Sequence, residues 1–271
     1  MKKNLFATTQ NQHAFLDLIE TFLEDKKIAG KAEKTILSYS GALKTVGLVI
    51  GLSRSVESIT KKDIEKFIGS CKERNLSEHS IEHHVKHFKA FMNWCANEGY
   101  SVVSVPSYSA PETVKPTYSD SDLMKLLKKP DMRTCQFSKY RDWVIVNFLI
   151  ETGCRASSLI AIRIDDVDFD NSLCQFRHNK TGKVQSVPLS LTLVKRLKAY
   201  LKIRGMVGDN VLFPQIDGTM MTYNALRLAI DRYNKKRGVS LTSIHAFRHP
   251  YVKHTTKNKS LQKQKSQAIK T

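Results

Sequence analysis

Near the end of the sequence, the stretch Ser243–His249 gathers side chains that could act on an anion. Two imidazoles and one guanidinium fall within five residues, and His245 and Arg248 are three residues apart. Ile244 and Phe247 have the same spacing, so one helical face can be buried while the basic pair shares a neighbouring face. A planar guanidinium fork matches the oxygens of a phosphate. The stretch therefore indicates a phosphate site, or alternatively the solvated start of a basic helix.

A second candidate, Arg155, follows an almost wholly apolar run, Trp143–Ile150. Such a run predicts a buried helix, and Gly153 is a natural C-terminal cap for it. Arg155 is then expected on a tight turn between this helix and a short second one. The alternative is a structural arginine that pairs with Asp165 or Asp166.

A third candidate, Lys180, lies where the hydrophobic period changes from helical to alternating. Residues 173–176 and 183–189 are predicted strands, and Asn179–Gly182 is a predicted turn between them. Lys180 is thus expected at the tip of a β-hairpin. A lysine in a turn is most often solvated, so by itself this position would indicate no function.

The first hundred residues predict helices only. Apolar residues recur with a helical period in four segments, which begin near Gln12, Ala32, Thr60 and Ser77. The last segment also carries His79, His83, His84 and His87. Their spacing could hold a metal, but no suitable cysteine or carboxylate set accompanies them, so we expect a solvated or phosphate-facing surface and no metal or other cofactor.

The composition favours a partner that carries many negative charges. The 271 residues have 44 Lys+Arg against 25 Asp+Glu, a formal charge of +19 that we expect to form an extended basic surface. The five cysteines form no C-x-x-C pair, which is typical of reduced thiols in the cytoplasm. No signal peptide or membrane span is predicted. We expect double-stranded DNA as the partner and no binding to a membrane. The expected location is therefore the cytoplasm or, in a prokaryote, the nucleoid.

The order of these features divides the chain. We expect a four-helix domain over residues 10–100 and a linker over 101–117, where three prolines occur without a helical stripe. Residues 118–254 are expected to form a mixed α/β domain, and 255–271 a basic tail with no apolar period, which predicts disorder.

An arginine after a buried helix, a lysine in a β-turn and then His-x-x-Arg-His resembles the tyrosine recombinases, the phage-integrase type of DNA recombinase. The resemblance covers most of the chain. It implies a mainly α fold with a small β-hairpin: an N-terminal core-binding (SAM-like) domain followed by a catalytic domain. It also implies that Arg155 and Arg248 clamp the scissile phosphate, that Lys180 (or, as the less favoured choice, Lys183) protonates the leaving oxygen, and that His245 assists proton transfer.

The chemistry that the resemblance implies suits these residue types. Attack on a phosphodiester builds negative charge on its non-bridging oxygens, which two permanently charged guanidinium groups can stabilise without a metal. In the family a tyrosine attacks and forms a 3′-phosphotyrosyl intermediate, through which strands are cut and rejoined.

Two departures from the family pattern stand out. Ser158 occupies the place, three residues after Arg155, where the family usually has an acid. The last tyrosine, Tyr251, is too close to Arg248 to match the nucleophile, which leads us to expect a catalytic domain cut short before its tyrosine box. We therefore expect a recombinase that is inactive alone and works, if at all, as a homo-oligomer on DNA or with a full-length recombinase. The alternatives are a non-catalytic DNA-binding remnant that competes for recombination sites and an unrelated basic nucleic-acid-binding protein.

Overall fold

The computed structural model describes residues 14–177, 184–205 and 210–248. The chain divides into two compact units, Met1–Thr113 and Val114–Thr271, each with a hydrophobic core of its own. Most of the excess positive charge falls in the second unit, because the first carries almost as many acidic as basic residues. The positive charge is thus unevenly divided between the two units, whereas an extended basic surface was predicted.

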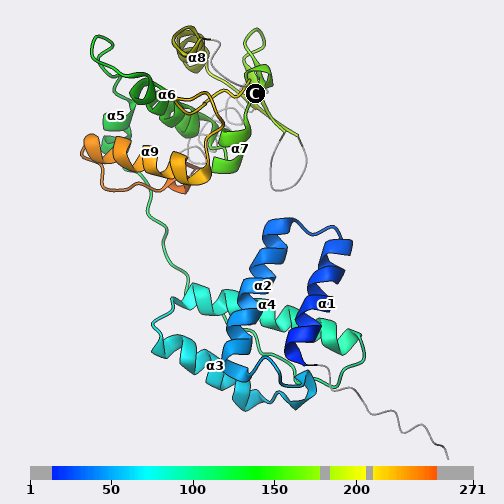
Figure 1. The fold of residues 1–271 in the computed structure, drawn as a ribbon. Coiled ribbons are helices and arrows are strands. Elements are labelled where there is room, and N and C mark those ends of the chain that lie inside the picture. The colour runs from blue at the N-terminus through cyan, green and yellow to red at the C-terminus, as the bar shows by residue number, and fades with distance from the viewer. Residues whose placement is uncertain (1–13, 178–183, 206–209, 249–271) are drawn as a thin grey trace, which may run out of the picture. The chain divides into compact units, whose positions relative to one another are not determined.

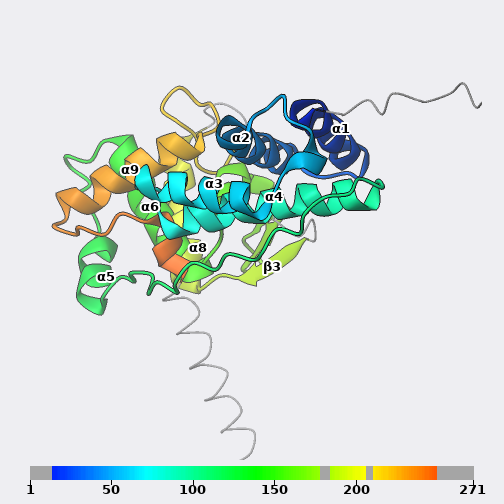
Figure 2. The same ribbon diagram turned by 90° about the horizontal axis from the view of Figure 1, so that it is seen from below.

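The described part of the N-terminal unit is a bundle of four helices, as predicted. They are α1 (Phe15–Ile28), α2 (Glu33–Ile50), α3 (Lys61–Glu73) and α4 (Glu78–Asn97), with a 3-10 turn η1 (Val56–Ser58) before α3. Helix α4 packs across α1 and α2 (Figures 1 and 2). Three interlocking aromatic rings, Phe15, Phe22 and Phe91, are fully buried between these helices and make edge-to-face contacts.

Residues 101–119 form neither helix nor strand, and part of this segment is fixed to the N-terminal unit. Val105 is completely buried in its core, and the Tyr108 hydroxyl donates a hydrogen bond to Glu78. Lys89 also donates a hydrogen bond to Ser107 at 2.8 Å. The segment predicted as a linker is therefore packed along α4 over much of its length.

The C-terminal unit is built around α6 (Phe137–Thr152), which is buried on nearly all sides. Around α6 lie α5 (Asp120–Leu127), α8 (Leu191–Arg204) and α9 (Tyr223–Lys236), and α7 (Ala156–Ala161) packs on α9 (Figure 1). A 3-10 turn η2 (Ile164–Asp166) leads into a three-stranded antiparallel sheet. Its strands β1 (Val167–Asp168), β2 (Leu173–Phe176) and β3 (Gln185–Pro188) lie in that order, which leaves β3 at an edge (Figure 2).

Local signals in the sequence account for several of these element ends. Capping boxes, in which side chain and backbone bond reciprocally, open α3 at Thr60 with Asp63 and α5 at Ser119 with Asp122. Gly153 ends α6 in the left-handed conformation at φ 56°, which glycine adopts without strain. No helix in the described ranges is long and apolar enough to cross a membrane.

Candidate phosphate-binding site

Arg155 is held at the end of the buried helix by the backbone that precedes it. After Gly153 turns the chain, the Cys154 amide donates a hydrogen bond to the Thr152 hydroxyl at 3.3 Å, and Cys154 is buried. Arg155 is the N-cap of α7, where its carbonyl accepts a hydrogen bond from Leu159 at 2.9 Å. Its side chain is exposed, so the packed turn presents the guanidinium to solvent.

Among the described residues, Arg155 does not form the structural ion pair with Asp165 or Asp166 that was its predicted alternative role. Asp166 pairs instead with Arg177 at 2.5 Å and accepts a hydrogen bond from the Arg163 amide, while Asp165 bonds to Asn210. Within the described ranges, neither Arg155 nor Arg248 forms an ion pair with a carboxylate.

Arg248 follows the 3-10 turn η3 (Ile244–Phe247), which is anchored by its apolar residues. Ile244, Ala246 and Phe247 are buried, whereas His245 is exposed and Arg248 is partly buried. The apolar pair three residues apart is thus buried as predicted, although the turn is tighter than the expected α-helix.

The two arginines are close enough to interact. Burial lowers the pKa of Arg248, and the like charge of Arg155 lowers it further, whereas Cys154 acts in the opposite direction. Neither of these mutually repelling cations has a carboxylate partner among the residues that the structure describes. An anion would stabilise the pair, because it offsets both the repulsion and the loss of hydration. The structure thus brings two of the four predicted site residues together. Of the other two predicted site residues, His245 lies on the turn just before Arg248. Lys180 and its alternative Lys183 lie outside the described residues.

A buried polar group that was not predicted fixes η3 in place. The ring of Tyr118 stacks on Phe247 with centroids 4.3 Å apart, and its hydroxyl donates a hydrogen bond to the Ser243 carbonyl at 3.1 Å. Asn234 of α9, which is fully buried, donates to the Tyr118 hydroxyl at 2.9 Å and to the Leu241 carbonyl at 2.8 Å. The signal in the sequence was a polar residue within the apolar stripe of α9, four residues after Ile230.

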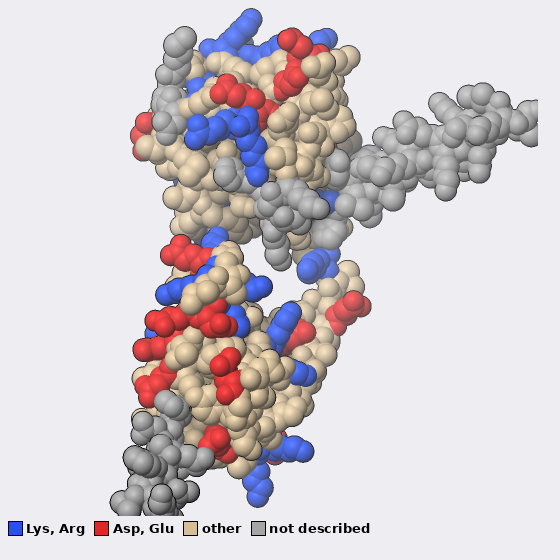
Figure 3. Space-filling view, turned by 90° about the vertical axis from the view of Figure 1, so that its right-hand side faces the viewer, with Lys and Arg blue, Asp and Glu red and all other residues tan. Residues whose placement is uncertain are grey.

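Ser158, which stands where an acid was expected by resemblance, is buried in α7. Two of the histidines of α4 lie beside a hydroxyl group of α2. His83 and His87 each have Nε2 3.2 Å from the Ser38 hydroxyl, and no metal-binding group of three or more ligands occurs in the part of the chain that the structure describes. On the face of the N-terminal unit seen in Figure 3, acidic and basic side chains are interspersed.

Comparisons with known proteins agree with this architecture. A sequence model described as the phage integrase family matches residues 119–263, and one described as the phage integrase N-terminal SAM-like domain matches residues 18–101. Tyrosine recombinase XerD of Staphylococcus haemolyticus is 26% identical over 257 residues, which cover 89% of this chain and 85% of XerD. Tyrosine recombinase XerA of Pyrococcus horikoshii is 25% identical over 248 residues, covering 88% and 79%.

Solved structures share the fold at low sequence identity. A lambda integrase (75–356) dimer bound to a COC′ core site gives a TM-score of 0.73 at 12% identity, covering 89% of both chains. The Tn1549 transposon integrase in complex with transposon right end DNA also gives 0.73, at 17% identity, covering 88% of this chain and 85% of that one.

Proposed function

The chain belongs to the phage integrase family, and we propose that it binds duplex DNA so that Arg155 and Arg248 clamp the phosphate at which a tyrosine recombinase acts. The observation that carries the proposal is the nearness of two guanidinium groups with no carboxylate partner in the described ranges. Permanently charged, forked donors stabilise the charge that develops on a phosphate under attack. We keep the domain boundaries predicted from the sequence, 10–100 and 118–254, and expect both domains to contact the duplex. The C-terminal unit is called the catalytic unit from here on.

We assign proton transfer to the remaining candidates. Lys180, or Lys183, would protonate the leaving 5′-oxygen, and His245 would assist proton transfer at the attacking group. By analogy with the lambda integrase dimer and tetramer, this chain would assemble as a homo-oligomer on DNA or with a full-length recombinase.

The clamp is tested by Arg155→Ala and Arg248→Ala, with Arg133→Ala as the control. Arg133 is exposed and pairs with Asp131 on the surface, so its replacement removes the same charge without touching the site. A charged hydrogen bond contributes roughly 1.5–3 kcal/mol, so each site variant should bind a cognate duplex about tenfold to a hundredfold more weakly. The slope of log K against log salt should also fall by about 0.9 for each phosphate that the variant no longer neutralises. Equal footprints for all three variants and the parent would refute the clamp.

The catalytic step has its own test, because the described residues assign no tyrosine to the attack. The chain is incubated with a nicked suicide duplex and run on a denaturing gel, with and without a full-length recombinase. A covalent band that Tyr251→Phe removes would assign the nucleophile to Tyr251. A band that appears only with the full-length protein would support donation of the tyrosine by a partner. DNA binding without any band would favour the alternative function, a non-catalytic protein that competes for recombination sites.

A further inference from the structure

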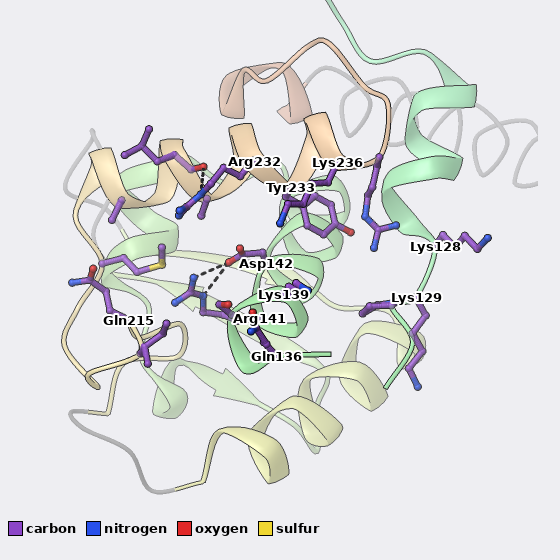
Figure 4. A pocket seen from close by; sticks show the side chains of 18 of the residues that line it. Lys128, Lys129, Gln136, Lys139, Arg141, Asp142, Gln215, Arg232, Tyr233 and Lys236 are labelled. Carbon is purple, nitrogen blue, oxygen red and sulfur yellow. Dashed lines mark hydrogen bonds and ion pairs between the residues drawn. The ribbon is translucent and has the colours of Figure 1, made fainter. Parts of the chain in front are cut away.

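A large cavity opens in the C-terminal unit at the start of α6, at the opposite end of this helix from Arg155. Its volume is about 1060 Å³, and it lies between α9, the first turns of α6, the residues after α5 and the loop 215–221 (Figure 4). Besides Arg141, six lining residues carry positive charge: Lys128, Lys129, Lys139, Arg232, Lys236 and Arg237. The cavity therefore has a strongly basic rim.

The two acids of the cavity do not balance this rim. Asp142 pairs with Arg141 at 2.8 Å, and Arg141 also donates to the Pro214 carbonyl, so this pair is closed on itself in the floor. Figure 4 shows the pair beneath α9. Asp217 accepts hydrogen bonds from the backbone and hydroxyl of Thr219. None of Lys128, Lys139 and Lys236 has a carboxylate partner among the described residues.

Apolar side chains also line the cavity. Ile216 is 75% exposed and Leu228 is 42% exposed, and Met221 lies buried beside them. Exposed large apolar groups next to unpaired basic groups favour a ligand that has both an apolar and an acidic face. A DNA backbone offers charge alone, so binding it here would leave the apolar wall without a partner.

The cavity is separate from the phosphate clamp. It uses Ser138, Lys139, Arg141 and Asp142 at the start of α6, whereas Arg155 comes after the other end of this helix. At 1.5 Å per residue, about 15 Å of helix lies between Asp142 and Thr152. One ligand on the scissile phosphate therefore does not fill both sites.

We propose that this cavity docks an acidic amphipathic helical segment of a partner protein. Charge complementarity selects the occupant: carboxylates would meet the rim, and one apolar stripe would cover Ile216 and Leu228. The chain's own terminal stretches are poor occupants, because residues 1–13 and 249–271 contain lysines and no Asp or Glu. The site would thus recruit a second protein to a chain that is bound to DNA.

A labelled 16-residue helical peptide, with Glu on one face and Leu on the other, is the probe, and its binding to the full chain is followed by fluorescence anisotropy. The first comparison is a peptide with every Glu changed to Gln. The test variant is Arg232→Glu/Lys236→Glu, and the matched control is Lys195→Glu/Lys202→Glu, which changes the same charge at exposed positions of α8. Leu228→Ser tests the apolar wall.

The proposal expects the test variant to bind the peptide at least about tenfold more weakly, the control to change by less than about twofold, and the Gln peptide to bind poorly. Leu228→Ser should weaken binding while leaving the far-ultraviolet spectrum unchanged. The absence of measurable peptide binding to the parent, or an equal weakening in the control, overturns the proposal. It is overturned too if the test variant selectively fails to bind duplex DNA, which would place the cavity on the DNA surface. A selective loss of self-association would instead identify a second copy as the occupant.

Discussion

The Tyr118 hydroxyl links the start of the catalytic unit to the turn that carries His245 and Arg248, and Tyr118→Phe tests this link. The substitution keeps the ring stacked on Phe247 but removes the donor to the Ser243 carbonyl and the acceptor for Asn234. The hydrogen bond from Asn234 is buried, and the one to the Ser243 carbonyl is partly buried. The expected result is a less stable catalytic unit in which η3 is less firmly held.

The magnitude follows from the number of bonds and the groups left behind. A hydrogen bond contributes about 0.5–1.5 kcal/mol net, so removing two would cost about 1–3 kcal/mol. Asn234 keeps its bond to the Leu241 carbonyl and Ser243 is exposed, so the lower part of this range applies, about 1–2 kcal/mol. In a domain of this size 1 kcal/mol changes Tm by about 2–4 °C, which gives a fall of about 2–8 °C.

The chain allows this unit to be followed selectively, because it has two tryptophans and only Trp143 lies in the catalytic unit. Guanidinium unfolding is measured by Trp143 fluorescence in a Trp94→Phe background. Tyr223→Phe is the control, since that tyrosine is 59% exposed at the start of α9. Equal unfolding midpoints for Tyr118→Phe, the control and the parent would refute the assigned role of the hydroxyl.

Three further predictions concern the stability of each unit. Hydrogen bonds from Arg54, and to a smaller extent from Thr60, hold the pKa of Asp63 well below its usual range. The stability that the ionised carboxylate contributes is therefore present above about pH 4 and is lost as the pH falls. Asp63→Asn should cost about 1–2 kcal/mol at neutral pH, and it should make the stability of the N-terminal unit less dependent on pH on the acid side. Burial raises the pKa of Tyr200 and Tyr233, so the stability that their neutral phenols contribute to the C-terminal unit should be fully present below about pH 10 and be lost as the pH rises above it, with phenolate absorbance appearing together with unfolding. Leu226→Ala, at a fully buried position of α9, should cost about 2–5 kcal/mol in guanidinium unfolding followed by Trp143 fluorescence.

Features governed by neighbours along the chain were predictable from the sequence. The four N-terminal helices, the buried α6 and its glycine cap follow from hydrophobic period and side-chain chemistry, and all are confirmed. The hairpin is confirmed in outline: β2 spans the predicted residues, and β3 begins two residues later than the predicted return strand.

Features that depend on distant segments could not be predicted from the residues alone. The stack of Tyr118 on Phe247 and the hydrogen bond from Asn234 to the Tyr118 hydroxyl join segments more than a hundred residues apart. No local pattern encodes such a contact. The burial of Val105 is a similar case. A proline-rich segment predicts a linker, and its packing into the core of the N-terminal unit depends on helices that are distant in the sequence.

The same reasoning applies to the candidate phosphate site. Packing against Phe247 and the glycine turn after α6 hold two like charges near each other, although their repulsion and the partial burial of Arg248 oppose this arrangement. A carboxylate between them would relieve the repulsion, but it would also occupy the place of a phosphate. The packed surroundings therefore position the two arginines, a task that an ion pair performs at other sites, and both guanidinium groups remain available to an anion. The buried hydrogen bonds behind η3 have this positioning role. Because these bonds involve uncharged groups, they hold the turn in place whether or not the charge of the arginines is balanced.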